Sequence, residues 1–127
     1  MSAVVLDASA VLAVINGEPG ADTVIASLSD ARICAVNYAE VISKLVDKHV
    51  ELSDALDAVT KLGVSIVDFD ADLAASVGAL RPATKGRGIS LADRACLALA
   101  GRDGIPALTG DRRWASLSIA AQVRLFR

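Results

Sequence analysis

The chain has 127 residues, a length that predicts a single domain over residues 1–127 with a core of its own. Lys and Arg total 13 against 15 Asp and Glu, so the formal net charge is -2, which excludes a polycationic arm that wraps nucleic acid. Hydrophobic residues make up 54% of the chain, which excludes intrinsic disorder.

The sequence predicts neither a membrane segment nor a secretory leader. The longest apolar runs, residues 8–15 and 95–100, fall short of the ~18–20 residues that cross a bilayer. A strand-like run follows Met-Ser directly, without the basic region of a signal peptide. Cys34 and Cys96 stand far apart in apolar sequence, which predicts buried thiols rather than a metal pair or a disulfide. We therefore expect a cytoplasmic protein with no membrane contact.

Short apolar segments alternate with longer helical segments along the whole chain. In chain order, the sequence predicts strands at residues 3–6, 31–35, 64–67, 106–108 and 123–126. It predicts helices at residues 8–15, 18–28, 37–50, 53–63, 70–80 and 90–100, with a basic loop at 82–88 and a turn at 101–104. This alternation is typical of an α/β fold, in which a parallel central sheet is flanked by helices in three layers. Ligands bind such sheets beyond the carboxyl ends of the strands.

Four acidic residues stand where predicted helices begin, and helix capping explains each of them singly. A carboxylate at a helix start is favourable by ~0.3–1 kcal/mol through the helix dipole. The spacings of Asn37 to Glu40 and of Ser90 to Asp93 are those of capping boxes. The four acids are Asp7, Glu40, Asp93 and Asp111.

Taken together, the four acids predict a metal site rather than four caps. Glu40 and Asp93 lie in apolar helical sequence, where a carboxylate needs a partner. If the four elements end at one edge of the sheet, mutual repulsion forbids full ionisation unless a cation is bound. Carboxylate oxygens and water are the ligands that Mg²⁺ and Mn²⁺ prefer, and such an ion offsets the charge that builds on a phosphodiester during hydrolysis.

Four motifs occur in order along the chain: VLDASA at 5–10, VNYAEV at 36–41, SLADRACLA at 90–98 and LTGDRRW at 108–114. Together they resemble the PIN-domain ribonucleases, and most closely the VapC toxins of bacterial type II toxin–antitoxin systems. The resemblance implies a PIN fold whose four acids surround one or two divalent ions, with Asp7 and Asp93 as direct ligands. It also implies that Ser9 and Thr109 place hydroxyls beside the acids, while Asn37 only caps its helix.

The same resemblance implies an activity and partners. The activity is metal-dependent hydrolysis of RNA, with Mg²⁺ or Mn²⁺ as cofactor and 5′-phosphate ends on the products. The substrate is a transfer, ribosomal or messenger RNA. The implied partners are a VapB-like antitoxin that inhibits the enzyme and a second copy in a homodimer. Some relatives carry a further acid after the fourth, whereas Arg112 and Arg113 follow Asp111 here, which favours a single ion at rest.

Basic residues around the last two acids are candidates for RNA phosphate contacts, although solvated surface positions explain them equally well. The candidates for these contacts are Arg94, Arg112, Lys85 and Arg87. His49, the only histidine, lies among charged residues at a predicted helix end, which indicates a surface position rather than a general base. Trp114 is predicted to pack in the core rather than to stack on a base.

Two other functions remain open at this point. One is a catalytically silent PIN-like binding or assembly module, in which the acids serve only as caps. The other is an aspartate-based phosphatase, although such enzymes place a second Asp two positions after the nucleophile, where this chain has Ser9. Stabilisation by Mg²⁺ or Mn²⁺ separates a metal site from four isolated caps.

Overall fold

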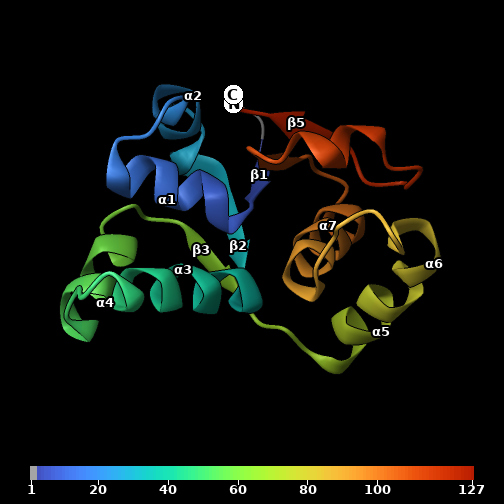
Figure 1. Ribbon diagram of the computed structural model, residues 1–127, viewed down its shortest axis with the longest axis horizontal. Coiled ribbons are helices and arrows are strands. Elements are labelled where there is room, and N and C mark those ends of the chain that lie inside the picture. The colour runs from blue at the N-terminus through green and yellow to red at the C-terminus, as the bar shows by residue number, and fades with distance from the viewer. Residues whose placement is uncertain (1–2) are drawn as a thin grey trace.

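Short apolar segments form a fully parallel five-stranded sheet in the computed structural model, which describes residues 3–127 (Figure 1). The strand order is β3-β2-β1-β4-β5, so the first strand is central and the chain extends the sheet on both sides of it. The strands are β1 (Val4–Leu6), β2 (Ala31–Cys34), β3 (Ser65–Val67), β4 (Ala107–Thr109) and β5 (Val123–Leu125). In β1, Val5 is in register with Arg32 of β2 and with Ala107 of β4.

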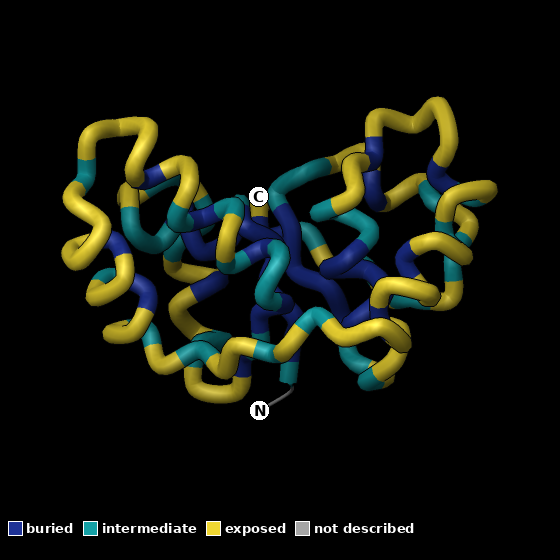
Figure 2. Tube along the Cα trace, turned by 90° about the horizontal axis from the view of Figure 1, so that it is seen from below, coloured by how far each residue is buried: buried dark blue, intermediate teal, exposed yellow. Residues whose placement is uncertain are grey.

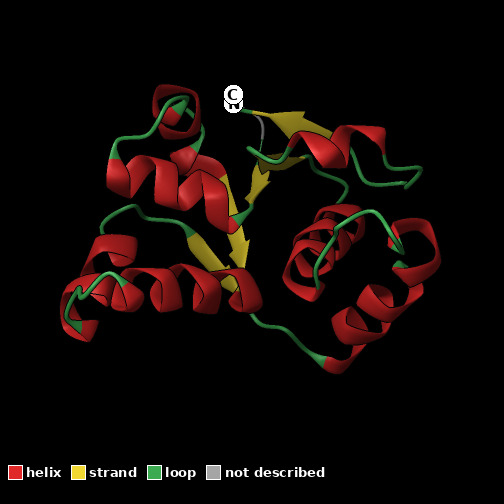
Figure 3. Cartoon of the chain, viewed as in Figure 1, coloured by secondary structure: helices red, strands yellow, loops and turns green. Residues whose placement is uncertain are grey.

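Helices cover both faces of the sheet, as the alternating pattern predicts (Figures 1 and 3). On one side lie α1 (Ala8–Asn16), α2 (Ala21–Ile25), α3 (Ala35–Asp47) and α4 (Leu52–Thr60). On the other lie α5 (Ala71–Ala79), α6 (Arg81–Thr84) and α7 (Leu91–Asp103). Two 3-10 turns, η1 (Leu28–Asp30) and η2 (Arg112–Ser116), precede β2 and follow β4. The three-layer α/β/α prediction is confirmed.

Alternation along the strands creates a separate core on each face of the sheet. Val4 and Leu6 pack with α1, α3 and α4, whereas Val5 between them packs with α5 and α7. Cys34 and Cys96 are buried in the second core as free thiols, as predicted. Figure 2 shows the buried residues along the middle of the molecule and the exposed ones on the outer helices. Within residues 3–127, no helix is both long and apolar enough to cross a membrane.

Several element boundaries differ from the predicted ones, each for a local reason. In place of the predicted helix 18–28, the structure has α2 and, beginning at Leu28, the turn η1. Helix α2 begins only at Ala21, because Gly20 before it has a left-handed backbone. The predicted loop 82–88 contains α6 at its start. Helix α7 continues through the predicted turn 101–104 and ends at Gly104, whose left-handed backbone caps it.

The C-terminal residues close over the loop between α1 and α2. Arg127 donates hydrogen bonds to Glu18 and to the carbonyl oxygen of Pro19. Gly20 has a φ of +86°, and a Cβ at this position lies 2.5 Å from the carbonyl oxygen of Phe126. The loop therefore requires glycine for two independent reasons, its backbone conformation and its contact with the end of the chain.

Gly20→Ala is expected to destabilise the protein by about 1–3 kcal/mol, because backbone atoms must move to admit the methyl group. Gly17→Ala is the matched control, since Gly17 also has a positive φ, +64°, but nothing lies within 4 Å of the point that its Cβ would occupy. Urea unfolding of both variants measures the difference. An equal loss of stability in the two variants would show that the contact with Phe126 carries no energetic weight.

Candidate active site

Asp7 is the buried centre of a hydroxyl network at the carboxyl end of β1. Its side chain is 5% exposed, and one oxygen, Oδ2, accepts hydrogen bonds from Ser9 at 2.8 Å and from Thr109 at 2.9 Å. Asp7 occupies the N-cap position of α1, as predicted. Its side chain makes no capping hydrogen bond, however, so the predicted capping role is wrong. The carboxylate is thus held by one side chain from the first turn of α1 and one from the end of β4.

The two hydroxyls are themselves fixed from the other side. Ser9 accepts a hydrogen bond from the backbone N–H of Gly110, and Thr109 accepts one from the backbone N–H of Asp111. Each hydroxyl therefore donates to Asp7 and accepts from the turn that follows β4. This arrangement sets the orientation of the Asp7 carboxylate relative to the β4–η2 junction.

Glu40 and Asp93 share the surroundings of Asp7. Burial raises the pKa of Asp7, the hydrogen bonds from Ser9 and Thr109 oppose that rise, and the charge of Asp93 adds to it. Burial also raises the pKa of the half-buried Glu40, Lys44 lowers it, and the charges of Asp7 and Asp93 raise it again. The structure thus brings three of the four predicted acids into one electrostatic neighbourhood.

Asp93 is held by the capping box predicted for the start of α7. Its Oδ2 accepts a hydrogen bond from the backbone N–H of Ser90 at 2.8 Å, and the Ser90 hydroxyl accepts one from the backbone N–H of Asp93 at 3.1 Å. This prediction is confirmed. The capping box does not compete with a further role, because a carboxylate has acceptor sites beyond the one that Ser90 uses.

Asn37 does not cap its helix. Helix α3 begins at Ala35, so Asn37 lies inside the first turn, where its side chain is completely buried. Its Nδ2 donates a hydrogen bond to the carbonyl oxygen of Ala92 at 2.9 Å, and its Oδ1 is buried without a partner among residues 3–127. The predicted capping box is therefore wrong. The side chain instead joins α3 to the first turn of α7, the two helices that carry Glu40 and Asp93.

Asp111 is engaged by a neighbouring arginine of its own chain. It accepts the backbone N–H of Arg113 as the cap of η2, and the Arg113 guanidinium contacts both carboxylate oxygens, at 2.9 Å and 2.6 Å. The hydrogen bonds from Arg113 lower the pKa of Asp111. Hydrogen bonding to Asp111 in turn raises the pKa of Arg113, and the nearby charge of Asp93 raises it further. Arg113 is therefore ion-paired with the fourth acid and lies within electrostatic range of the third.

The acids do not form a ready-made metal cage. Across residues 3–127, no group of three Asp, Glu, His or Cys side chains is placed to hold a metal ion together. The expected convergence of four carboxylates is reduced to three neighbours, with Arg113 beside the fourth. Mg²⁺ commonly binds through one or two carboxylates and keeps several waters. A buried carboxylate beside a second acid suits such an ion. A divalent cation offsets both the cost of burying the Asp7 charge and its repulsion from Asp93, the two effects that raise the pKa of Asp7.

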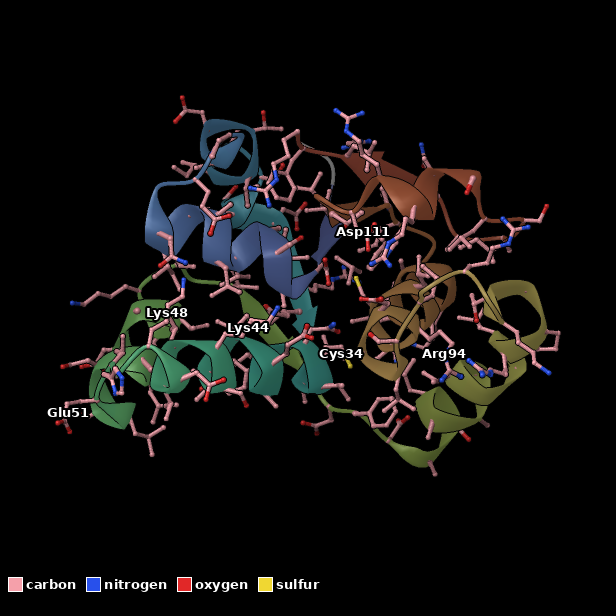
Figure 4. All side chains as sticks on the ribbon, viewed as in Figure 1. Cys34, Lys44, Lys48, Glu51, Arg94 and Asp111 are labelled. Atoms are coloured by element: carbon pink, nitrogen blue, oxygen red, sulfur yellow. The ribbon has the colours of Figure 1, made fainter. Side chains whose placement is uncertain are left out.

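The basic residues predicted to contact RNA differ in their positions. Arg94 lies between α7 and α5, where its guanidinium donates to the carbonyl oxygen of Val77 and its Nε is buried (Figure 4). Arg94 follows Asp93, and consecutive residues point about 100° apart around a helix. The Arg94 side chain therefore points toward α5 rather than along the direction of the acid, which disagrees with the predicted RNA contact. The other three candidates, Lys85, Arg87 and Arg112, are exposed. Trp114 is buried in the core, as predicted.

Comparisons with known proteins give the family of this fold. The model of the PIN domain family matches residues 4–120. No curated protein is similar enough in sequence to be matched. Among solved structures, a chain of the DNA-bound VapBC complex of Salmonella typhimurium is similar with a TM-score of 0.79 and 19% identity, and 100% of both chains is covered.

Two further solved structures are similar over nearly the whole chain. A toxin–antitoxin complex of Klebsiella pneumoniae gives a TM-score of 0.74 at 20% identity, covering 98% of both chains. A VapC of Mycobacterium tuberculosis, described as a toxin that cleaves the sarcin–ricin loop, gives 0.69 at 17% identity, covering 93% of this chain and 98% of that one. The motifs around the acids, the parallel sheet and the match to residues 4–120 agree, and the chain belongs to the PIN-domain family.

Proposed function

We propose that this protein is a divalent-metal-dependent endoribonuclease of the VapC toxin type. The observation that carries the proposal is the Asp7 carboxylate, which is buried, oriented by two hydroxyls and placed in the same neighbourhood as Glu40 and Asp93. Burying a carboxylate beside two others is costly for folding alone, so this arrangement favours a function that uses a cation. The similarity to a toxin that is described as cleaving the sarcin–ricin loop, an RNA, supports the choice of RNA as substrate.

Asp7 and Asp93 are the residues that would hold Mg²⁺ or Mn²⁺. When bound, such an ion offsets negative charge on the phosphate and lowers the pKa of water. Ser9 and Thr109 keep the Asp7 carboxylate in a fixed orientation throughout. Glu40, whose pKa burial raises and Lys44 lowers, is suited to accept a proton from the attacking water.

The products follow from which oxygen attacks. Attack of water on phosphorus with departure of the 3′-oxygen leaves a 5′-phosphate on one product and a 3′-hydroxyl on the other. A cyclic phosphate arises only when the ribose 2′-hydroxyl is the attacking group, whereas the base proposed here, Glu40, takes its proton from water. We therefore expect 5′-phosphate ends.

A catalytically silent PIN-like module is the second candidate function. The lack of a three-ligand group within residues 3–127 is the observation in its favour. An aspartate-based phosphatase fits less well, because Ser9 stands where such enzymes place a second Asp, and its hydroxyl and that of Thr109 occupy one oxygen of Asp7.

The proposed partners are a VapB-like antitoxin and a second copy of the chain. The similar structures from Salmonella typhimurium and Klebsiella pneumoniae are complexes with antitoxins, which supports the first. Several large apolar side chains on α3 and α4 are exposed, which favours contact with some partner. These side chains are Val46, Leu52 and Leu56.

Mg²⁺ or Mn²⁺ is expected to stabilise the protein against thermal unfolding, by about 2.7 kcal/mol at a hundred times the dissociation constant. Asp93→Asn should abolish this stabilisation, whereas Asp57→Asn, a change at an exposed acid of α4, should preserve it. Melting curves with and without metal, together with cleavage of a total RNA pool, test the proposal. A wild-type protein that neither responds to metal nor cleaves RNA supports the silent module instead.

A further inference from the structure

A hollow of about 380 Å³ is lined mainly by residues of α1 and α3. Ser9, which donates to Asp7, lines one end of it. We call this hollow the α1–α3 groove. From α1 it is lined by Ser9, Leu12 and Asn16, from α3 by Lys44 and Leu45, and from the residue that follows α3 by Lys48.

Lys44 and Lys48 continue a row on α3 that starts at Glu40. The three residues are four positions apart, so they share one face of the helix. Figure 4 shows the two lysines on the side of α3 that faces α1. The charge of Lys44 acts on Glu40, whose pKa it lowers, which confirms that the row reaches the acidic neighbourhood. A cationic track thus extends from the site along the groove.

The positive charge of this track is only partly compensated. Arg127 and Glu18, which also line the groove, neutralise each other in an ion pair of 3.0 Å. Asp47 lines the groove as well and offsets one charge. Within the described part of the chain, neither Lys44 nor Lys48 forms an ion pair. The groove therefore keeps a net positive charge in a protein whose formal net charge is -2.

The size and lining of the groove suit one nucleotide. Its volume is at the small end of the ~300–1,000 Å³ that ligand pockets occupy, which fits a single nucleotide better than a helical element. Leu12 and Leu45, which are largely buried in the core, form an apolar floor of small exposed area, and Ser9 and Asn16 provide polar groups beside it. Unpaired nucleotides expose their bases to such contacts, whereas nucleotides within an A-form helix do not.

We propose that the α1–α3 groove binds a nucleotide of single-stranded RNA next to the bond that is cut, with Lys44 and Lys48 contacting backbone phosphates. This inference rests on the proposed ribonuclease function. It extends that function by assigning a substrate subsite to one side of the acids. The groove selects for unpaired RNA, because a duplex cannot place a base between α1 and α3.

RNA binding without metal tests the subsite separately from cleavage. The probe is a fluorescently labelled 12-nucleotide single-stranded RNA of mixed sequence, titrated with the full chain in EDTA at several salt concentrations. Each phosphate contact on single-stranded RNA contributes about 0.7 to the slope of log K against log salt. Lys48→Gln should lower this slope by about 0.7 and Lys44→Gln with Lys48→Gln by about 1.4, and the double variant should bind about tenfold more weakly at low salt.

Lys61→Gln is the matched control, since Lys61 is an exposed lysine at the end of α4 and does not line the groove. Lys48→Arg should bind as the wild type does, because it keeps the charge. With Mg²⁺ or Mn²⁺ present, Lys48→Gln should raise KM with kcat unchanged, the sign of lost uniform binding. Lys48 is the cleaner position, because Lys44 also affects the pKa of Glu40.

The outcomes distinguish this inference from the proposed function. Lysine variants with the affinity, salt slope and KM of Lys61→Gln would overturn the subsite, even if the wild type cleaves RNA. Wild-type protein that binds the 12-mer through the lysines but never cleaves it would overturn the ribonuclease proposal on which the inference rests. Loss of binding to a co-expressed antitoxin, with RNA affinity and KM unchanged, would assign the groove to a protein segment instead.

Discussion

Asp7→Asn is expected to reduce RNA cleavage by about a hundredfold or more while the protein remains folded. The amide oxygen can still accept the hydrogen bonds from Ser9 and Thr109, so the local structure survives. The negative charge is lost, however, and with it the residue best placed to hold a divalent cation. Single-turnover cleavage of the RNA target, measured beside melting curves, separates loss of function from loss of fold.

The same variant should alter the dependence of stability on pH. Because burial raises the pKa of Asp7, the folded metal-free protein holds that proton more tightly than the unfolded chain does. Between the two pKa values the folded state binds more protons, so the free energy of unfolding falls as pH rises from about 4. Asp7→Asn has no carboxylate to ionise, so its free energy of unfolding does not fall in this way. The variant should therefore be more stable than the wild type at neutral pH.

Urea unfolding between about pH 4 and pH 7 in EDTA measures this difference. Glu40, whose pKa is raised chiefly by burial, contributes a similar loss of stability in both proteins and cancels in the comparison to first order. If wild type and Asp7→Asn keep the same difference in stability across this range, Asp7 does not titrate as its burial requires. A variant that cleaves RNA at the wild-type rate would remove Asp7 from the active site.

Asp111→Asn is expected to lose much less activity than Asp93→Asn, about tenfold or less against about a hundredfold or more. The physical reason is the ion pair with Arg113, whose guanidinium contacts both oxygens of Asp111. A carboxylate neutralised in this way contributes little to binding a cation. Among residues 3–127, Asp93 forms no ion pair, and its Oδ2 accepts a hydrogen bond from the backbone N–H of Ser90. Cleavage rates at saturating Mg²⁺ or Mn²⁺ compare the two variants.

Arg113→Ala provides the complementary control for this prediction. With the guanidinium removed, Asp111 becomes available to a cation, so calorimetric titration should detect an additional or tighter divalent ion per chain. Two results together would contradict this prediction: Asp111→Asn and Asp93→Asn are equally inactive, and Arg113→Ala binds metal as the wild type does. They would mean that the ion pair between Arg113 and Asp111 is broken in the working enzyme.

The alternation of strands and helices was predictable because hydrophobic periodicity depends on local sequence. The position of Asp7 at the start of α1 and the capping box at Ser90 were predictable for the same reason, since each follows from residues nearby in the chain. Asn37 was misinterpreted because a good capping residue and a buried hydrogen-bonding residue look alike in sequence. Only the packing of α3 on α7 places its amide against the carbonyl oxygen of Ala92.

The electrostatic surroundings of the acids were harder to predict. Arg113 follows Asp111 by two residues, and the Asx-type turn that brings them together is a recognisable local signal. The positions of Lys44 and Lys48 carried a signal in their spacing from Glu40, but no motif marks them. Whether such lysines border a groove depends on how α1 lies beside α3, which sequence periodicity does not determine.

The hydroxyl network around Asp7 has a consequence for synthesis of the chain. Thr109 and Asp7 are 102 residues apart, and β4, which carries Thr109, pairs with both β1 and the last strand, β5. A chain on the ribosome that has not yet reached β4 therefore contains Asp7 and Ser9 but lacks Thr109, the second hydroxyl that holds the carboxylate. We therefore expect the proposed activity to arise only after β4 has been made and has paired with β1, which gives an antitoxin made at the same time an interval in which to bind.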